Sequence, residues 1–370
     1  MRIVIFAYNY EPAAGVGVLR PAYWAKHMNE IDPEITCDVI TAQENSTLPV
    51  LPGGGRVITV KNEGHFLNRF KLDAGAAWTK YLERFFYNTR EKYDVAIFTG
   101  GPFVHFFFAE ILKRKFNSKI IFDFRDPFAN NPNHRLNVFK RYIKRAVERK
   151  MLKIPDVSIT VNKVCRDLLE KDEFTRVEII DNGYDETFLV NPKTLIEKEK
   201  HRIVYAGKFY KGASPENLFK VLKQRQESVE FDYMGPHSET VLLVNSRNFL
   251  ISGTVTYMEA FQRIAEADTG IILTGGEPFE STTKVFDYIG LEKNILIITN
   301  GEPKAGILHE ITKGYPNVFW ARNSENDIRN VLEGVMYHIP KQYPEKEKFS
   351  RRAGLIKLVN IINRLFEEKK

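Results

Sequence analysis

Two threonines, a lysine and an aspartate stand close together in the segment ESTTKVFDYIG, whose spacing is that of a helix. We expect Thr282, Thr283 and Lys284 at its first turn, with Asp287 one turn further on, within reach of a ribose diol. The first turn of a helix has unpaired backbone N–H groups and a partial positive charge, so it attracts anions such as phosphate. The alternative is ordinary helix capping by Ser281 or Thr282.

Two further lysines follow a glycine in the segment VYAGKFYKGASPENL. Gly207, Lys208 and Lys211 come at the end of a predicted strand, where ammonium groups would neutralise a departing diphosphate. Together with Thr282 and Thr283 they would form two halves of one anion site within the same domain. An ordinary pair of surface lysines is the alternative.

Glycines also follow the first predicted strand, in AYNYEPAAGVGVLRPAYW. Gly15 and Gly17 would let the backbone approach an anion or a sugar closely before the next helix begins. The third glycine of a dinucleotide-binding fingerprint is missing, and a tight turn without a ligand explains the pair equally well.

Two titratable residues follow other strands of the first half. His105, in FTGGPFVHFFF, stands beside three phenylalanines; it is a candidate at a cleft or, alternatively, a histidine of the core. Asp126, in FDFRDPFANNP, could act as a base or a sugar ligand at its strand terminus. The neighbouring Arg125 offers a structural ion pair instead.

Short apolar runs rich in β-branched residues alternate with segments of helical spacing along the whole chain. In the first half we predict strands at 2–8, 37–42, 56–60, 93–100, 119–125, 157–161 and 177–181. In the second half we predict strands at 201–207, 230–235, 249–254, 269–274, 294–299 and 317–321. Continuous apolar strands separated by amphipathic helices indicate parallel sheets covered on both faces, here in two doubly wound α/β domains.

A polar and charged seam, NPKTLIEKEKHR, separates the two series of strands. We place the first domain at 1–190 and the second at 191–345. The segment 346–370 has leucine, isoleucine and valine at helical spacing, which predicts one long terminal helix.

Composition excludes several classes of function. The chain has 370 residues, a modest formal charge of +7 and only two cysteines, which lack the spacing of a zinc site. We expect a reduced, cytoplasmic protein without a disulfide framework, a metal site or a nucleic-acid partner. The most apolar stretch is interrupted by glycine, proline and histidine, so no transmembrane span is expected.

A basic segment, NVFKRYIKRAVERKMLK, has an apolar stripe formed by Phe139, Ile143, Val147 and Met151. Such a stripe usually faces the core while the charges face water. Together with residues 65–71 it could instead lie on an anionic membrane. The protein would then be peripheral on the inner face of the cell membrane.

At this point the sequence resembles the GT-B glycosyltransferases of the large retaining group, similar to glycosyltransferase family 4, that builds bacterial polysaccharides and lipid-linked sugars. The resemblance covers nearly the whole chain. In the first half it rests on YNYEPAAGVGVLRPAYWAKHM, GPFVH, IIFDFRDPF and IDNGYDETF. In the second half it rests on IVYAGKFYKG, AEADTGIIL and ESTTKVFDYIGLEKNILII. It implies two Rossmann-like domains, with a last helix that returns to the first domain.

The resemblance also implies roles for the residues above. His105 would lie near the reacting sugar and Asp126 near the acceptor, with Gly15 and Gly17 at the cleft floor. The lysines, with Thr282 and Thr283, would hold the donor diphosphate, and Asp287 would bind the ribose. The chain departs from the family's Glu-x7-Glu pattern, because Glu280, the implied sugar ligand, stands one residue from the first position.

The implied activity is transfer of a hexosyl group from a nucleoside diphosphate sugar, with UDP favoured over GDP, to a hydroxyl of a glycan or lipid-linked acceptor. No cofactor or metal is implied, because lysines stabilise the leaving diphosphate. The segment 252–258 is a candidate for base recognition. A sugar-nucleotide epimerase of the same fold and a non-catalytic nucleotide-sugar-binding subunit are the alternatives.

Overall fold

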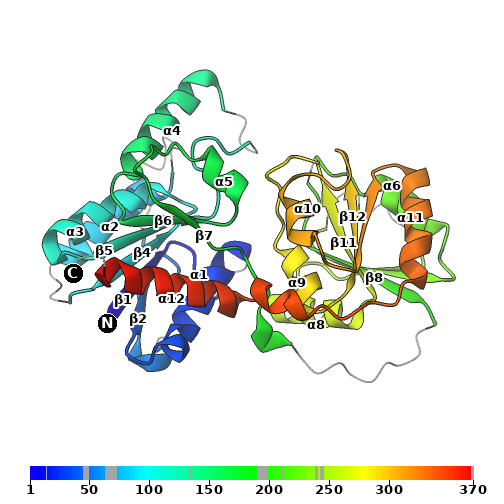
Figure 1. Ribbon diagram of the computed structural model, residues 1–370, viewed down its shortest axis with the longest axis horizontal. Helices are drawn as coiled ribbons and strands as arrows, with labels where there is room; N and C mark the ends of the chain where they lie inside the picture. Colours follow the sequence, from blue (N-terminus) through cyan, green and yellow to red (C-terminus); the bar gives the residue numbers. More distant parts are fainter. Residues whose placement is uncertain are drawn as a thin grey trace. The chain divides into compact units, whose positions relative to one another are not determined.

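The chain forms two compact units, each built around one parallel sheet (Figure 1). A computed structural model describes residues 1–13, 15–44, 50–62, 73–87, 89, 91–132, 136–189, 199–210, 212–237, 241 and 246–367. Unit 1 consists of Met1–Asn182 with Arg351–Lys370, and unit 2 of Gly183–Ser350. The predicted boundary between 190 and 191 lies outside the described residues.

The sheet of unit 1 confirms the strands predicted in the first half of the sequence. Its strands are β1 (Arg2–Ala7), β2 (Thr36–Thr41), β3 (Val57–Thr59), β4 (Val95–Thr99), β5 (Lys119–Phe124), β6 (Val157–Thr160) and β7 (Val177–Ile179). They pair in parallel in the order β3-β2-β1-β4-β5-β6-β7. The strands are nearly all apolar because helices cover both faces.

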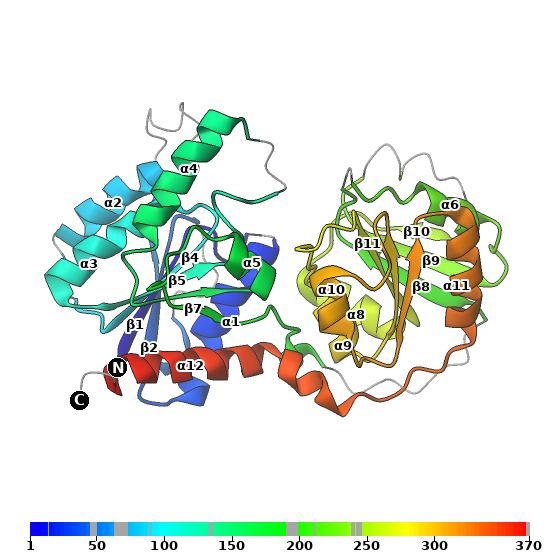
Figure 2. The ribbon, with the colours of Figure 1, turned by 45° about the horizontal axis from the view of Figure 1, so that its top comes forward.

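Alternate residues of β1 show how the two faces of this sheet are covered. The helices are α1 (Val16–Ile31), α2 (Gly75–Tyr87), α3 (Ala109–Phe116), α4 (Val138–Met151), α5 (Lys163–Leu168) and α12 (Arg351–Glu367). Ile3 and Ile5 belong to the core formed with α1 and α12, whereas Val4 and Phe6 belong to the core formed with α2 and α3 (Figure 2). None of the helices within the described residues is long and apolar enough to cross a lipid bilayer.

The terminal helix α12 returns to unit 1, as the resemblance implied. Leu355, Leu358 and Ile362 are fully buried in the core that α1 shares. The helix begins at Arg351 and not at the predicted residue 346, and a short 3-10 helix, η5 (Pro344–Phe349), precedes it. Ser350 interrupts the two because its extended backbone forms a β-bridge with Tyr184.

Unit 2 repeats the architecture with six strands, which confirms the strands predicted in the second half. These are β8 (His201–Ala206), β9 (Val229–Met234), β10 (Phe249–Ile251), β11 (Thr269–Thr274), β12 (Asn294–Thr299) and β13 (Val318–Arg322), in the order β10-β9-β8-β11-β12-β13. The helices are α6 (Glu216–Lys223), α8 (Tyr257–Glu266), α9 (Lys284–Gly290), α10 (Gly306–Thr312) and α11 (Glu325–Tyr337).

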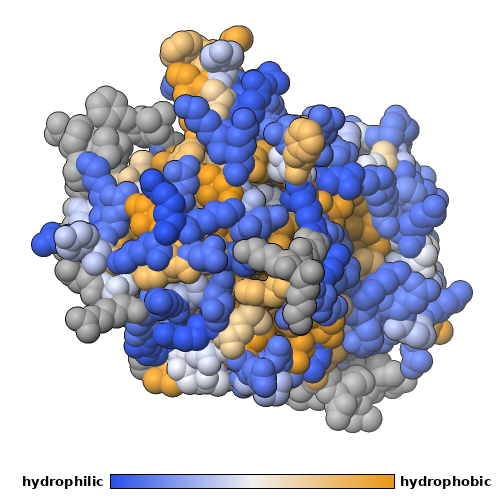
Figure 3. All heavy atoms as spheres, turned by 60° about the vertical axis from the view of Figure 1, so that its left-hand side comes forward, coloured by the Kyte–Doolittle hydropathy of each residue, from blue (hydrophilic) through white to orange (hydrophobic). Residues whose placement is uncertain are grey.

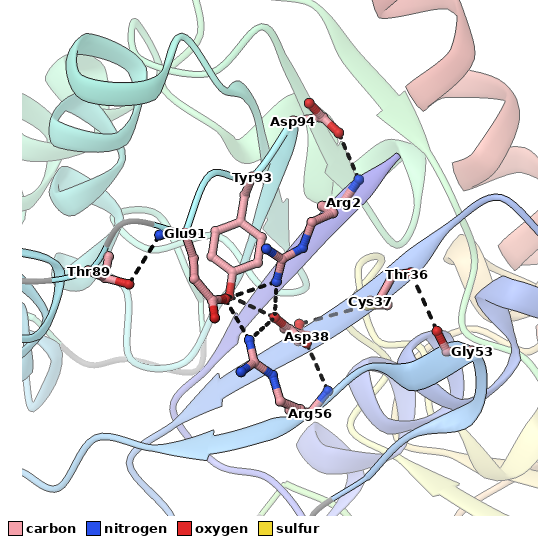
Figure 4. A network of polar contacts seen from close by, with 10 residues as sticks. All are labelled: Arg2, Thr36, Cys37, Asp38, Gly53, Arg56, Thr89, Glu91, Tyr93 and Asp94. Atoms are coloured by element: carbon pink, nitrogen blue, oxygen red, sulfur yellow. Dashed lines mark hydrogen bonds and ion pairs between the residues drawn. The ribbon is translucent and has the colours of Figure 1, made fainter.

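A charged network ties the amino-terminal ends of the first strands in unit 1 (Figure 4). Asp38 of β2, almost fully buried, accepts hydrogen bonds from Arg2 at 3.0 Å and from the Tyr93 hydroxyl at 2.8 Å. Arg56 contacts both Asp38, at 3.3 Å, and Glu91, at 2.5 Å. Because each charge is paired, this cluster is a structural tie between neighbouring strands.

Unit 2 has the same tie at the corresponding place. Asp232 of β9, fully buried, accepts hydrogen bonds from Arg202 at 3.0 Å and from Nε of Arg263 at 3.0 Å. Asp268 accepts the backbone N–H of Arg202 at 2.8 Å, just as Asp94 accepts that of the first residue of β1 at 2.7 Å. The two sheets therefore repeat each other in strand order and in the ion pairs at their amino-terminal edges.

Candidate functional site

Strand order reverses between β8 and β11 in the second sheet, and this point locates the candidate site. The chain leaves the carboxyl ends of these two parallel strands toward opposite sides, which opens a crevice typical of ligand sites in doubly wound domains. The turn after β8 begins with Gly207, and α9 follows β11. Both segments carry site residues that the sequence predicts.

The structure brings the Gly207 turn and Lys284 together. Gly207 has a φ of +116°, a conformation that other residues rarely adopt. A Cβ atom at this position would lie 3.1 Å from Cε and 3.2 Å from Nζ of Lys284. The backbone conformation is therefore the reason for a glycine at residue 207, and the absence of a side chain there lets the end of Lys284 lie against the turn.

Tyr205 contacts both the turn that follows Gly207 and the side chain of Lys284. The sequence alone did not single it out. Its hydroxyl donates a hydrogen bond to the backbone carbonyl of Lys208 at 3.0 Å. Nζ of Lys284 lies 4.7 Å from the centre of its ring, the geometry of a cation–π contact. The side chain of Lys208 is exposed and lies over the ring of Tyr210 at 5.0 Å, and Lys211 lies outside the described residues.

Burial lowers the pKa of Lys284 to about 8, and the negative charge of Asp287 offsets only part of that effect. A lysine in such a place is poorly solvated, because protein replaces water around its ammonium group. The charged form would gain more from a bound anion here than an exposed lysine would. Lys284 is thus the residue of this corner best suited to a diphosphate.

Thr283, directly before Lys284, does not cap α9 through its side chain. Thr283 is the residue that precedes the helix, and its side chain makes no capping hydrogen bond among the described residues. The backbone carbonyls of Thr282 and Thr283 accept hydrogen bonds from Val285, at 3.3 Å, and Phe286, at 3.1 Å. The residue at the capping position is therefore Thr283. The alternative raised by the sequence, capping by Ser281 or Thr282, stays a prediction.

Asp287 is nearly buried on α9 and is held by Tyr257, the first residue of α8. The Tyr257 hydroxyl donates a hydrogen bond to Oδ1 of Asp287 at 2.6 Å. The ring of Phe188 packs edge-on against Tyr257, 5.8 Å between centroids. Tyr257 lies in the segment predicted to recognise a base, but the structure shows it orienting a carboxylate.

Glu280 closes the turn that follows β11. Its Oε2 accepts hydrogen bonds from the Thr274 hydroxyl and, at 3.1 Å, from the backbone N–H of Gly276. Gly276 has a φ of +92°, and a Cβ atom there would lie 2.4 Å from the backbone nitrogen of Gly301, so the loops after β11 and β12 touch. Glu280 shapes this edge of the sheet, and its role as a sugar ligand stays a prediction.

Arg125 joins the first turn of α1 and the loop after β4 at the carboxyl edge of the first sheet. It donates hydrogen bonds to the backbone carbonyl of Gly17, at 2.5 Å, and to that of Gly100. Gly15 stands before the first residue of α1 with a φ of +142°. The structural alternative for Asp126, an ion pair with Arg125, is wrong: the partners of Arg125 are backbone carbonyl groups, and no ion pair between these two residues occurs within the described chain.

His105 is fully buried in unit 1, on the 3-10 helix η3 (Val104–Phe108). The rings of Trp78, Phe98 and Phe106 surround it at centroid distances of 5.0, 5.9 and 5.1 Å. Burial lowers its pKa to about 3, so the imidazole is neutral at physiological pH. This is the environment of a core histidine, and its predicted role beside a reacting sugar stays a prediction.

Asp126 is exposed at the end of β5, whereas Asp123 inside the strand is fully buried. Asp123 accepts a hydrogen bond from Thr99 at 3.0 Å and forms an ion pair with Arg20 at 3.3 Å. Arg20, a buried arginine of α1, also donates to the carbonyl of Ile180 at 2.7 Å. The exposed Asp126 is thus the carboxylate of this pair that a ligand could reach.

The sequence matches no protein-family model and none of the curated proteins. Solved structures nevertheless match over the full length of the chain. Sucrose-phosphate synthase from Thermosynechococcus elongatus has a TM-score of 0.70 at 11% identity, covering 99% of each chain. Anabaena HepE in complex with UDP and glucose has a TM-score of 0.67 at 12% identity, covering 98% of this chain and 100% of its own.

A third similar structure is the lipopolysaccharide outer core galactosyltransferase WaaB, with a TM-score of 0.63 at 11% identity over 100% of both chains. These proteins are glycosyltransferases of the GT-B type. Because the sequence identities are this low, the structural similarity establishes the fold alone. The chain has the two-domain GT-B fold.

Proposed function

We propose that this protein is a glycosyltransferase that moves a hexosyl group from a nucleoside diphosphate sugar to a hydroxyl group of a glycan or lipid-linked acceptor. The proposal includes UDP as the favoured nucleotide, retention of anomeric configuration, and a place in the synthesis of a bacterial surface polysaccharide. The observation that carries it is Lys284 beside the Gly207 turn, at the strand-order reversal of a GT-B sheet.

The donor would bind to unit 2. Lys284, with Lys208 and Lys211, would neutralise the diphosphate, and Asp287, oriented by Tyr257, would accept hydrogen bonds from the ribose. HepE was crystallised with UDP and with UDP-glucose, which supports a nucleotide sugar as the ligand of this fold. Thr282, Thr283 and Glu280 would complete the site around the phosphates and the sugar.

These residues would act by stabilising negative charge on the leaving group. As the glycosidic bond breaks, negative charge develops on the departing diphosphate, and a poorly solvated ammonium group stabilises it more strongly than a hydrated one. No strong nucleophile is needed for this step. In unit 1, Gly15, Gly17, His105 and Asp126 are the residues that the resemblance assigns to the acceptor side and the reacting sugar.

The proposal is tested by incubating the protein with UDP-hexoses and GDP-hexoses and measuring nucleoside diphosphate release, with and without a mixture of phospholipid-linked and free oligosaccharide acceptors. A glycosyltransferase releases the diphosphate much faster when an acceptor is present. The Lys284→Ala variant should lose this activity, while Lys313→Ala, an exposed lysine remote in sequence from the site, should keep it.

The same assay separates the alternatives. An epimerase would convert the donor sugar without any acceptor, which proton NMR of the nucleotide sugar detects. A non-catalytic subunit would bind the nucleotide sugar and leave it intact. Either result would replace the transferase assignment.

A further inference from the structure

The first two turns of α4 expose large apolar side chains. Val138 is 87% exposed, Phe139 71% and Tyr142 70%, and Ile143 is also exposed. By contrast, Met151 at the other end of the helix is fully buried in the core of unit 1. The predicted apolar stripe is therefore divided: its last part packs against the protein and its first part does not.

Positive charge borders this apolar surface. The helix sequence VFKRYIKRAVERKM has six lysines or arginines and one acidic residue. At 100° per residue, Lys140 lies on one side of the exposed apolar arc and Arg141 on the other. The acidic residue, Glu148, is buried and accepts the N–H groups of Phe128, at 2.9 Å, and Ala129, at 3.2 Å.

The place of α4 in the fold leaves this surface accessible. In both ribbon views its amino-terminal turns extend beyond the sheet and the other helices of unit 1 (Figures 1 and 2). In the space-filling view, hydrophobic and hydrophilic residues lie side by side on the protrusion at the top, where α4 lies (Figure 3). Glu148 fixes the base of the helix, so the protruding turns have a defined support.

We propose that the first two turns of α4 bind the surface of an anionic lipid bilayer, with Phe139 and Tyr142 inserted at the boundary between headgroups and acyl chains. An interfacial helix needs an apolar face for that boundary and cations beside it for anionic headgroups, and α4 supplies both. A second copy of the chain fits less well, because two such helices would bring like charges together. This inference does not depend on the proposed function.

The experiment is co-sedimentation of the full chain with vesicles of phosphatidylcholine alone or of phosphatidylcholine mixed with phosphatidylglycerol, at low and high salt. We expect sedimentation with the mixed vesicles only, weakened by salt. The double variant Phe139→Ser with Tyr142→Ser should lower partitioning by at least about ten-fold, because two large apolar side chains no longer leave water.

Matched controls separate this surface from general stickiness. Tyr337→Ser with Ile339→Ser removes two equally exposed apolar side chains from unit 2 and should bind like the wild type. Lys140→Ala with Arg141→Ala should weaken binding to the mixed vesicles by at least about ten-fold, at about 1 kcal/mol per cation. The variant Lys313→Ala with Lys341→Ala removes two exposed cations of unit 2 and should bind the mixed vesicles like the wild type.

Three outcomes would overturn the inference. The first is no sedimentation with anionic vesicles at low salt. The second is equal sedimentation of the wild type and the Phe139→Ser, Tyr142→Ser variant. The third is a dimer, measured by analytical ultracentrifugation, that this variant dissociates in a protein that does not bind vesicles, which would make the surface a self-association site.

Discussion

The Gly207 turn leaves room for the end of the Lys284 side chain, and the ring of Tyr205 and the surrounding protein replace part of the water around its ammonium group. Burial alone disfavours its charge. A diphosphate next to the ammonium group would restore the favourable interaction that water no longer supplies. The cost of placing a lysine here is therefore recovered when the proposed ligand binds.

The pH dependence of UDP binding follows from this. The pKa of Lys284 is about 8, below that of an ordinary lysine, so the free protein loses this charge as the pH rises through about 8. Because a bound anion stabilises the charged form, UDP affinity should fall from that pH upward. Titration calorimetry over a pH series measures it.

The control for this pH dependence is Lys284→Arg, because a guanidinium group stays charged throughout. This variant should bind UDP with an affinity that does not change through pH 8. If the wild type and the variant show the same decline, a group other than Lys284 titrates and the assignment is wrong.

Asp287 gives a second prediction at the residue scale. If it binds the ribose diol, the wild type should prefer UDP over 2′-deoxy-UDP. Asp287→Asn should weaken UDP binding by about 1–2 kcal/mol and narrow that preference, because one charged hydrogen-bond acceptor is lost. Competition binding with both nucleotides measures the ratio of the affinities for UDP and 2′-deoxy-UDP. If this ratio is the same in the variant as in the wild type, Asp287 does not bind the ribose.

The sequence pointed to Lys284 and Asp287 but not to the residues that position them. Tyr257 meets Asp287 across 30 positions of the chain, and Tyr205 meets Lys284 from the strand next to β11. Tyr205 reads as an ordinary residue of an apolar strand, and Tyr257 belongs to the segment that the sequence assigned to base recognition and not to the support of Asp287. Only the three-dimensional fold shows that their hydroxyl groups or rings contact the site.

At the scale of elements, the strands were predictable because they are buried on both faces and read as continuous apolar runs. The sequence placed the ends of all thirteen described strands to within three residues, which is the usual uncertainty of strand ends. Helix packing was less predictable. The stripe of α4 suggested one face against the core, and Phe139 is instead exposed while Met151 is buried.

In each sheet, a buried aspartate paired with arginines holds neighbouring strands together at their amino-terminal ends. The glycine-rich loops lie at the opposite, carboxyl ends of the strands. Asp232 is fully buried between Arg202 and Arg263. Asp232→Ala should destabilise the protein by about 3 kcal/mol, because it leaves two largely buried guanidinium groups without a carboxylate. Urea denaturation monitored by circular dichroism measures the change.

A surface ion pair supplies the comparison for Asp232. Glu302 and Arg322 pair at 2.6 Å with both side chains mostly exposed, so Glu302→Gln should leave the urea midpoint unchanged. A midpoint for Asp232→Ala as high as that of the wild type would show that the tie does not hold the second sheet together.

At the scale of the whole molecule, two sheets with the same strand order and α12 returning to the first unit constitute the GT-B fold. The sequence indicated this fold because the order of weak motifs was preserved along the chain, although each motif alone carried little information. The exact start of α12 was not predictable, because the bridge between Ser350 and Tyr184 joins residues far apart in sequence.

The central claim is that unit 2 binds a nucleoside diphosphate at Lys284 and Lys208, and isothermal titration of UDP into four proteins tests it most directly. We predict equal binding by the wild type and Lys313→Ala. We predict binding weaker by about ten-fold or more, or about 1.4 kcal/mol, in Lys284→Ala and in Lys208→Ala. Equal affinity in all four proteins, or no heat of binding in the wild type with UDP, GDP or ADP, would contradict the account.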